Sequence, residues 1–101
     1  MSRLLGLLGL GLRGGNLVIG VDGVRTALQS GSCVLVVVAA DASPRAVEKV
    51  VRLAEGRGIP RLAGPLAEEI GAQLGRPPVM VVGVRDAALA RGLLQVAGAL
   101  V

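Results

Sequence analysis

Two unbroken apolar runs, VLVVVAA at residues 34–40 and VMVVGV at residues 79–84, limit the folds that this chain can adopt. A run rich in β-branched residues and without polar alternation is typical of a strand that is covered on both faces. We therefore expect both runs to be buried strands, with residues 34–40 at the centre of the sheet.

Amphipathic segments alternate with these runs. Apolar residues recur at helical spacing in five places. They predict helices over residues 3–13, 22–31, 44–56 and 65–75, and a last helix marked by Leu89, Leu93, Val96 and Leu100. This alternation predicts an α/β fold, a three-layer α-β-α sandwich. The chain is too short for two domains and has no linker, so residues 1–101 are expected to form one domain.

Local signals mark the ends of these elements. Asp22 and Ser43 are predicted to cap the second and third helices. Residues 17–19 form a short extended stretch, and residues 58–62 are expected to be an edge strand because Pro60 cannot donate to an inner ladder. The side chains expected to face inward from the third and fourth helices are Ala46, Val47, Val50, Val51, Ala54, Leu66, Ile70 and Leu74.

The composition restricts how the chain could bind nucleic acid. Phe, Tyr and Trp are absent, so no base can stack on an aromatic ring. The net charge of +4 and the pI near 11.1 suit a polyanionic partner, since cations that neutralise phosphates release counterions. Ten of the eleven cations are Arg, which would suit bidentate phosphate contacts, although the Ala-, Gly- and Pro-rich composition favours a GC-rich codon bias as the cause.

The sequence offers no self-sufficient catalytic constellation. It has no His, and its one cysteine, Cys33, adjoins an apolar run. Glu68 and Glu69 are adjacent on a predicted helix and point in different directions, which argues against a paired-carboxylate site. We therefore predict that the protein is not an enzyme and has no cofactor, metal ion or small-molecule substrate.

The third predicted helix carries cations at helical spacing. Arg45, Lys49 and Arg52 could follow a phosphate backbone. Glu48 and Glu55 are interleaved with them, which favours a solvated helix face of paired charges instead.

Cysteine usage and hydropathy suggest a cytoplasmic protein. A single cysteine cannot form an internal disulfide, which indicates a reducing compartment. Arg3 and the apolar residues 4–12 resemble part of a signal peptide, but Arg13 ends the run and no small-residue cleavage site follows. A folded first helix is expected, and no segment is apolar over the roughly 18 residues that span a bilayer.

Several short motifs, in order, resemble one known family. Residues 4–7 and 13–18 resemble its opening helix and its A-G-K-L-V-like turn, followed by residues 20–31 and 35–44. Gly58-Ile59-Pro60 resembles the family's N-I-P segment and Glu69-Ile70-Gly71 its E-L-G, and Gly75-Arg76-Pro77 precedes the last strand. The family is the superfamily of small ribosomal proteins that bind kink-turn RNA, which includes archaeal L-seven-Ae and eukaryotic L-thirty-e. Bacterial YlxQ-like proteins are the type that the chain most resembles.

The resemblance implies a small mixed sheet and a structured RNA as partner, rRNA or kink-turn-like, with ribosomal proteins as further partners. It implies that RNA is bound at the start of the second helix and at the loop between the last strand and the last helix. The residues at these positions are Gly20, Val21, Asp22, Gly23, Arg25, Thr26, Val84, Arg85 and Asp86.

The chain departs from the family pattern at the start of the second helix. Asp22, Gly23 and Thr26 stand where the family usually has Asn, Glu and Lys. A carboxylate cannot donate a hydrogen bond, and Gly23 has no side chain; Arg25, one position away, could replace the lost cation. Asp22 and Gly23 fit a capped helix with a permissive first turn as well as they fit an RNA contact.

Two functions follow from these observations. The first is a non-enzymatic RNA-binding protein, ribosome-associated or an accessory to RNA folding, that uses shape and backbone contacts. The second is a protein-interaction module of the same fold that has lost specific RNA recognition, with the Leu- and Gly-rich first helix as its docking face.

Overall fold

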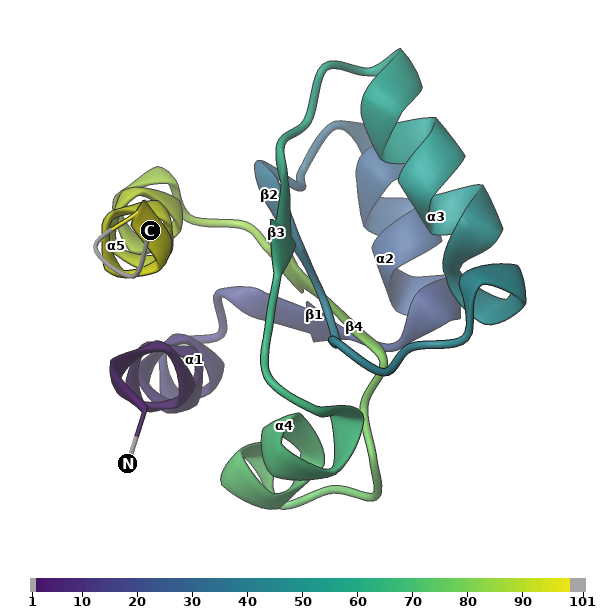
Figure 1. Cartoon of the computed structure of the whole chain (residues 1–101). Coiled ribbons are helices and arrows are strands. Elements are labelled where there is room, and N and C mark those ends of the chain that lie inside the picture. The colour runs from purple at the N-terminus through teal and green to yellow at the C-terminus, as the bar shows by residue number, and fades with distance from the viewer. Residues whose placement is uncertain (1, 99–101) are drawn as a thin grey trace.

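The computed structural model describes residues 2–98 and shows a sheet between two layers of helices (Figure 1). The elements along the chain are α1 (Arg3–Arg13), β1 (Leu17–Ile19), α2 (Val21–Ser30), β2 (Leu35–Val38), α3 (Pro44–Gly56), β3 (Arg61–Ala63), α4 (Ala67–Leu74), β4 (Val81–Val84) and α5 (Ala87–Gly98). Helices α2 and α3 cover one face of the sheet, while α1, α4 and α5 pack on the other. The predicted three-layer α-β-α sandwich is confirmed.

The sheet is mixed and has the strand order β1-β4-β2-β3. Strand β4 is antiparallel to β1 and to β2, while β3 is parallel to β2. Both runs predicted to be buried strands are therefore interior strands, each shorter than its apolar run. Val36 belongs to the core beneath α2 and α3, and its neighbours Leu35 and Val37 belong to the opposite core. This alternation is why an unbroken apolar run suits a strand that is covered on both faces.

Helix α2 begins at Val21, two residues earlier than a cap at Asp22 would allow, so Asp22 is not its cap. Gly20 occupies the N-cap position with φ 93°, a conformation that favours glycine, and no side chain caps the helix. The N–H of Gly20 donates to the carbonyl of Val81, which anchors this turn to β4. The chain turns from strand to helix within that one residue, so Asp22 is left exposed in the first helical turn.

The predicted edge strand is an edge strand, but it lies at Arg61–Ala63 instead of residues 58–62. Gly58 and Ile59 complete the end of α3, because their N–H groups donate to the carbonyls of Glu55 and Ala54. Pro60 precedes the strand and contributes its carbonyl, which accepts from the N–H of Val36 at 3.1 Å.

Three details of α3 and α4 differ from the predictions. Ser43 is the N-cap residue of α3, but its side chain makes no capping hydrogen bond. Ala46 is exposed instead of facing inward, since the buried stripe of α3 is Val47, Val50 and Ala54. Leu66 is also exposed, at 47%, because α4 begins at Ala67, which takes the buried position.

Helix α4 is capped by two carboxylates. Asp41 accepts from the N–H of Ala67 at 2.8 Å, across the end of the sheet, and Glu69 accepts from the N–H of Leu66 at 3.0 Å. Negative charge is favourable at a helix N-terminus, so both contacts stabilise the start of α4.

In α5, Leu93 is fully buried as expected, whereas the predicted contribution of Leu100 lies outside the described residues.

Gly71 on α4 offers a test of this packing. A Cβ there would overlap the carbonyl oxygen of Pro77, in the segment that returns from α4 to β4. We expect Gly71→Ala to lower the free energy of unfolding by about 1–3 kcal/mol, because backbone must move to admit the methyl group. Urea denaturation would measure the change.

Gly6→Ala is the matched control. Gly6 is also helical, and a Cβ there would have no atom within 4 Å. This variant should gain about 0.5–1 kcal/mol from helix propensity. Equal effects at the two positions would contradict the tight contact between α4 and Pro77.

Candidate nucleic-acid interface

The turn from β1 into α2 exposes free backbone donors. The first helical hydrogen bond runs from the N–H of Val24 to the carbonyl of Gly20 at 3.1 Å. Within residues 2–98, the N–H groups of Val21, Asp22 and Gly23 have no acceptor. Three free N–H groups and the positive end of the helix dipole make this turn suitable for binding an anion or another hydrogen-bond acceptor.

Gly23 lies close to β1 at this turn. A Cβ on Gly23 would lie 2.7 Å from Cγ1 of Val18, so the first turn of α2 sits directly against β1. A side chain at this position would require the Val18 side chain or the local backbone to shift. The glycine that stands where the family usually has Glu therefore fits a close approach of α2 to Val18, and its small size also opens the backbone to a ligand.

Thr26 and Arg25 lie further along α2. The hydroxyl of Thr26 donates to the carbonyl of Asp22 at 3.1 Å, so its proton is engaged with the helix backbone. Arg25 is half-buried and lines a groove between α2 and α3 together with Lys49 and Arg52. The predicted contacts on α2 thus divide between the turn at its start and this groove.

The structure does not place the second predicted segment beside the first. Val84 pairs with Leu17 at the start of β1, whereas Gly20, at the end of β1, bonds to Val81. Three strand residues separate these positions, or about 10 Å. The predicted residues at 20–26 and at 84–86 therefore lie at opposite ends of β1 and β4.

Residues 84–86 also have structural roles. The side chain of Val84 is completely buried, and the N–H of Arg85 donates to the carbonyl of Asn16 at 2.9 Å. Asp86 accepts from the N–H of Leu89 at 2.8 Å, which caps the start of α5. Only the Arg85 side chain is exposed and available for a ligand.

A segment that the sequence prediction did not assign to the site lies next to Gly20. Residues 75–80 connect α4 to β4, and Met80 immediately precedes the residue that bonds to Gly20. Met80 is 40% exposed, and Arg76 at the start of the segment is exposed as well. The signal was present as an exposed Gly-Arg-Pro-Pro before a buried strand, but its position beside Gly20 depends on the β1–β4 pairing. We call the first turn of α2 (residues 20–23) and the adjoining Met80 the β1–α2 corner.

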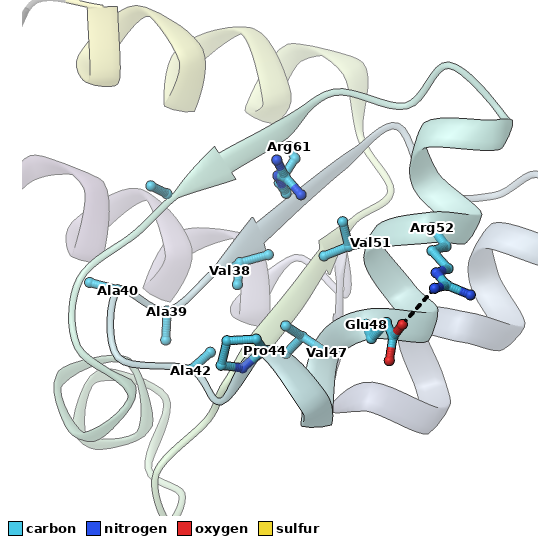
Figure 2. Close-up of a pocket in the computed structure, with 11 residues that line it drawn as sticks. Val38, Ala39, Ala40, Ala42, Pro44, Val47, Glu48, Val51, Arg52 and Arg61 are labelled. Atoms are coloured by element: carbon cyan, nitrogen blue, oxygen red, sulfur yellow. Dashed lines mark ion pairs between the residues drawn. The ribbon is translucent and has the colours of Figure 1, made fainter.

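One groove in the described part of the chain is mainly apolar. It has a volume of about 500 Å³ and lies between the β2–β3 edge and α3 (Figure 2). Val38, Val47 and Val51 form its walls, and the ion pair between Glu48 and Arg52, at 2.7 Å, lies at its rim. Small-molecule sites usually combine an apolar lining with a few polar groups at fixed positions. No polar side chain among the described residues is buried, so this groove has no buried polar group to orient such a ligand.

The described residues contain no group of three or more side chains suited to hold a metal ion. Cys33 is buried beneath α2, and burial raises the pKa of its thiol above the ordinary value. A thiol that stays protonated is a poor nucleophile and a poor metal ligand. None of the helices within residues 2–98 combines the length and hydropathy of a bilayer-spanning segment.

Sequence comparison settles the family. The model of the ribosomal protein L7Ae/L30e/S12e/Gadd45 family matches residues 3–93. The chain belongs to this family. No curated protein matches it in sequence.

Solved structures share the family fold with this chain. A protein of unknown function from Bacillus halodurans C has a TM-score of 0.90 and 28% identity, over 97% of this chain and 99% of that one. The 15.5kD RNA binding protein of Giardia lamblia has a TM-score of 0.79 and 25% identity, over 97% of this chain and 87% of that one. The resemblance seen in the sequence motifs is thus confirmed at the level of family and fold.

The burial of Cys33 predicts its reactivity. In the folded protein, its reaction with a thiol reagent such as DTNB should be slower than in urea by more than about two orders of magnitude, because reaction requires local opening. Stopped-flow absorbance would measure both rates. Similar rates in buffer and in urea would show that the thiol is accessible in the folded state.

Proposed function

We propose that this protein is a non-enzymatic, cytoplasmic RNA-binding protein, associated with the ribosome or accessory to RNA folding, in which the chain acts as one RNA-binding domain. The observation that carries the proposal is the β1–α2 corner. It has three free N–H groups, and the exposed Met80 directly precedes Val81, the residue to which Gly20 bonds, in a member of a family with an RNA-binding structural relative. The corner is a compact surface that a folded RNA could contact by shape.

The chemistry of the corner favours a base edge over a phosphate. Asp22 is exposed in the first turn of α2 and would repel a phosphate that approached the helix N-terminus. Its carboxylate can accept hydrogen bonds from base amino or imino groups, and the free N–H groups can donate to base carbonyls. Met80 supplies an apolar surface for an unstacked base, in place of the absent aromatic rings.

The Arg85 end of the sheet is not part of this proposed contact. It lies at the far end of β4, and two of its three predicted residues are engaged in the fold. We expect Arg85→Ala to change RNA affinity by less than about twofold, as for an exposed substitution away from a binding surface.

The first test is binding to a kink-turn RNA and to a plain duplex of equal length across a salt titration. We expect tighter binding to the kink-turn RNA at every salt concentration, and affinity for both RNAs that falls steeply with salt. Fluorescence anisotropy with labelled RNA would measure both. No binding to either RNA near micromolar protein would refute the proposed function.

Asp22→Ala tests the role of the corner. Loss of a base contact costs roughly 1–3 kcal/mol, so affinity for the kink-turn RNA should fall by about tenfold or more. Affinity for the duplex should stay the same or rise, because a negative charge is removed. Glu68→Ala, which removes an exposed carboxylate in the first turn of α4, is the matched control and should change neither. A parallel change for both RNAs in Asp22→Ala would argue against base reading at the corner.

A protein-interaction module is the second candidate, and exposed leucines favour it. Leu10 on α1 is 59% exposed and Leu94 on α5 is 39% exposed, on two helices of the same layer. Sedimentation of the protein without RNA would distinguish the two functions. A stable dimer that does not bind RNA would support the interaction module.

A further inference from the structure

A basic groove runs between the two helices that cover one face of the sheet. Arg25 and Gln29 of α2 line one side of it, one helical turn apart, and Lys49, Arg52 and Leu53 of α3 line the other. The groove has a volume of about 380 Å³ and opens to solvent. Three cations from two separate helices thus share one concave surface.

The positive charge of this groove is only partly neutralised. Arg52 pairs with Glu48 at 2.7 Å, but their side chains are 77% and 52% exposed. Exposed ion pairs of this kind contribute little to stability and are screened by salt. Among residues 2–98, neither Arg25 nor Lys49 forms an ion pair. Glu48 therefore offsets at most one of the three cations, and Arg25 adds a charge from the neighbouring helix that α3 does not neutralise.

The groove begins a short distance along α2 from the β1–α2 corner. Strands β1 and β2 both run antiparallel to β4, so both end at the same end of the sheet, where α2 and α3 begin. The two helices therefore run side by side in the same direction (Figure 1). Arg25 lies five residues after Gly20, about 7.5 Å along the helix axis. A strand whose bases contact the corner can pass its backbone along this groove.

We propose that the groove between α2 and α3 binds the phosphodiester backbone of the RNA on one side of the β1–α2 corner. This inference rests on the proposed function and extends it by a second contact surface. Arg25 and Arg52 can each bind a phosphate with two parallel hydrogen bonds, Lys49 acts as a point charge, and the Gln29 amide donates. The groove holds a single apolar side chain, Leu53, whereas protein interfaces need apolar anchors at their centre.

The double variant Lys49→Gln/Arg52→Gln tests the groove without altering the corner. Both side chains are exposed, so the fold should be retained, and circular dichroism melting would verify this. We expect the slope of log affinity against log salt to fall by about 1.4–1.8 for both the kink-turn RNA and the duplex. The preference for the kink-turn RNA should persist, because phosphate contacts position an RNA without reading its bases.

The matched control is Arg3→Gln/Arg91→Gln, which removes the same charge from exposed positions on α1 and α5, in the opposite layer. If the control lowers the slope as much as Lys49→Gln/Arg52→Gln does, net charge alone explains the effect and the proposed phosphate contact in the groove is refuted. If the wild type binds RNA and the slope of Lys49→Gln/Arg52→Gln is unchanged, the groove is refuted and the proposed function stands. If the wild type binds neither RNA, the proposed function fails and the groove with it.

Glu48→Gln provides a test in the opposite direction. It frees Arg52 and removes a negative charge beside the groove, so both RNAs should bind more tightly, by about threefold at low salt. Glu68→Gln, on α4, should have no such effect. Unchanged or weaker binding in Glu48→Gln would contradict a phosphate contact at Arg52.

Discussion

Strand β4 is hydrogen-bonded along both edges, to β1 and to β2, and all four of its residues are buried. Because both neighbours run antiparallel to it, the chain leaves β1 and β2 at the same end of the sheet. The N–H of Gly20 and the carbonyl of Val81 join the start of α2 to this strand. The corner with its free N–H groups and the parallel pair of helices beside it both depend on this pairing.

The absence of aromatic residues affects packing and recognition alike. The core consists of Val, Leu, Ile, Ala and one Cys, so helices must approach the sheet closely to exclude water. At Gly23 a Cβ would meet the side chain of Val18 in β1, and at Gly71 a Cβ would meet the backbone of the α4–β4 segment. On the surface, RNA recognition is left to backbone donors, cations and a thioether, which is consistent with reading shape more than stacked bases.

Sequence patterns predicted the kind and order of every element, because apolar runs and helical stripes are local and strong. Their boundaries were less predictable where long-range contacts compete with local signals. The turn after α3 uses Gly58 and Ile59 to satisfy helix carbonyls, which moves the edge strand to residues 61–63. Asp41 lies in the turn before α3, yet its side chain caps α4, and its bonding partner Ala67 is 26 residues away.

The candidate site was likewise only partly predictable from local sequence. The start of α2 could be located from short motifs, since the glycine turn and the first helical residues are neighbours in the chain. Whether residues 84–86 or Met80 lie beside that turn depends on the register of β1 against β4, which no local pattern encodes. The basic groove also depends on tertiary contacts. The sequence of α3 alone favours a helix face on which Glu and the cations pair with one another, and only the packing of α2 against α3 brings Arg25 to Lys49 and Arg52. Local residue patterns were therefore sufficient to predict the α/β fold class and the family, because both depend on short segments of the sequence. The surfaces that could contact RNA follow from strand pairing and helix packing, which join residues far apart in the chain.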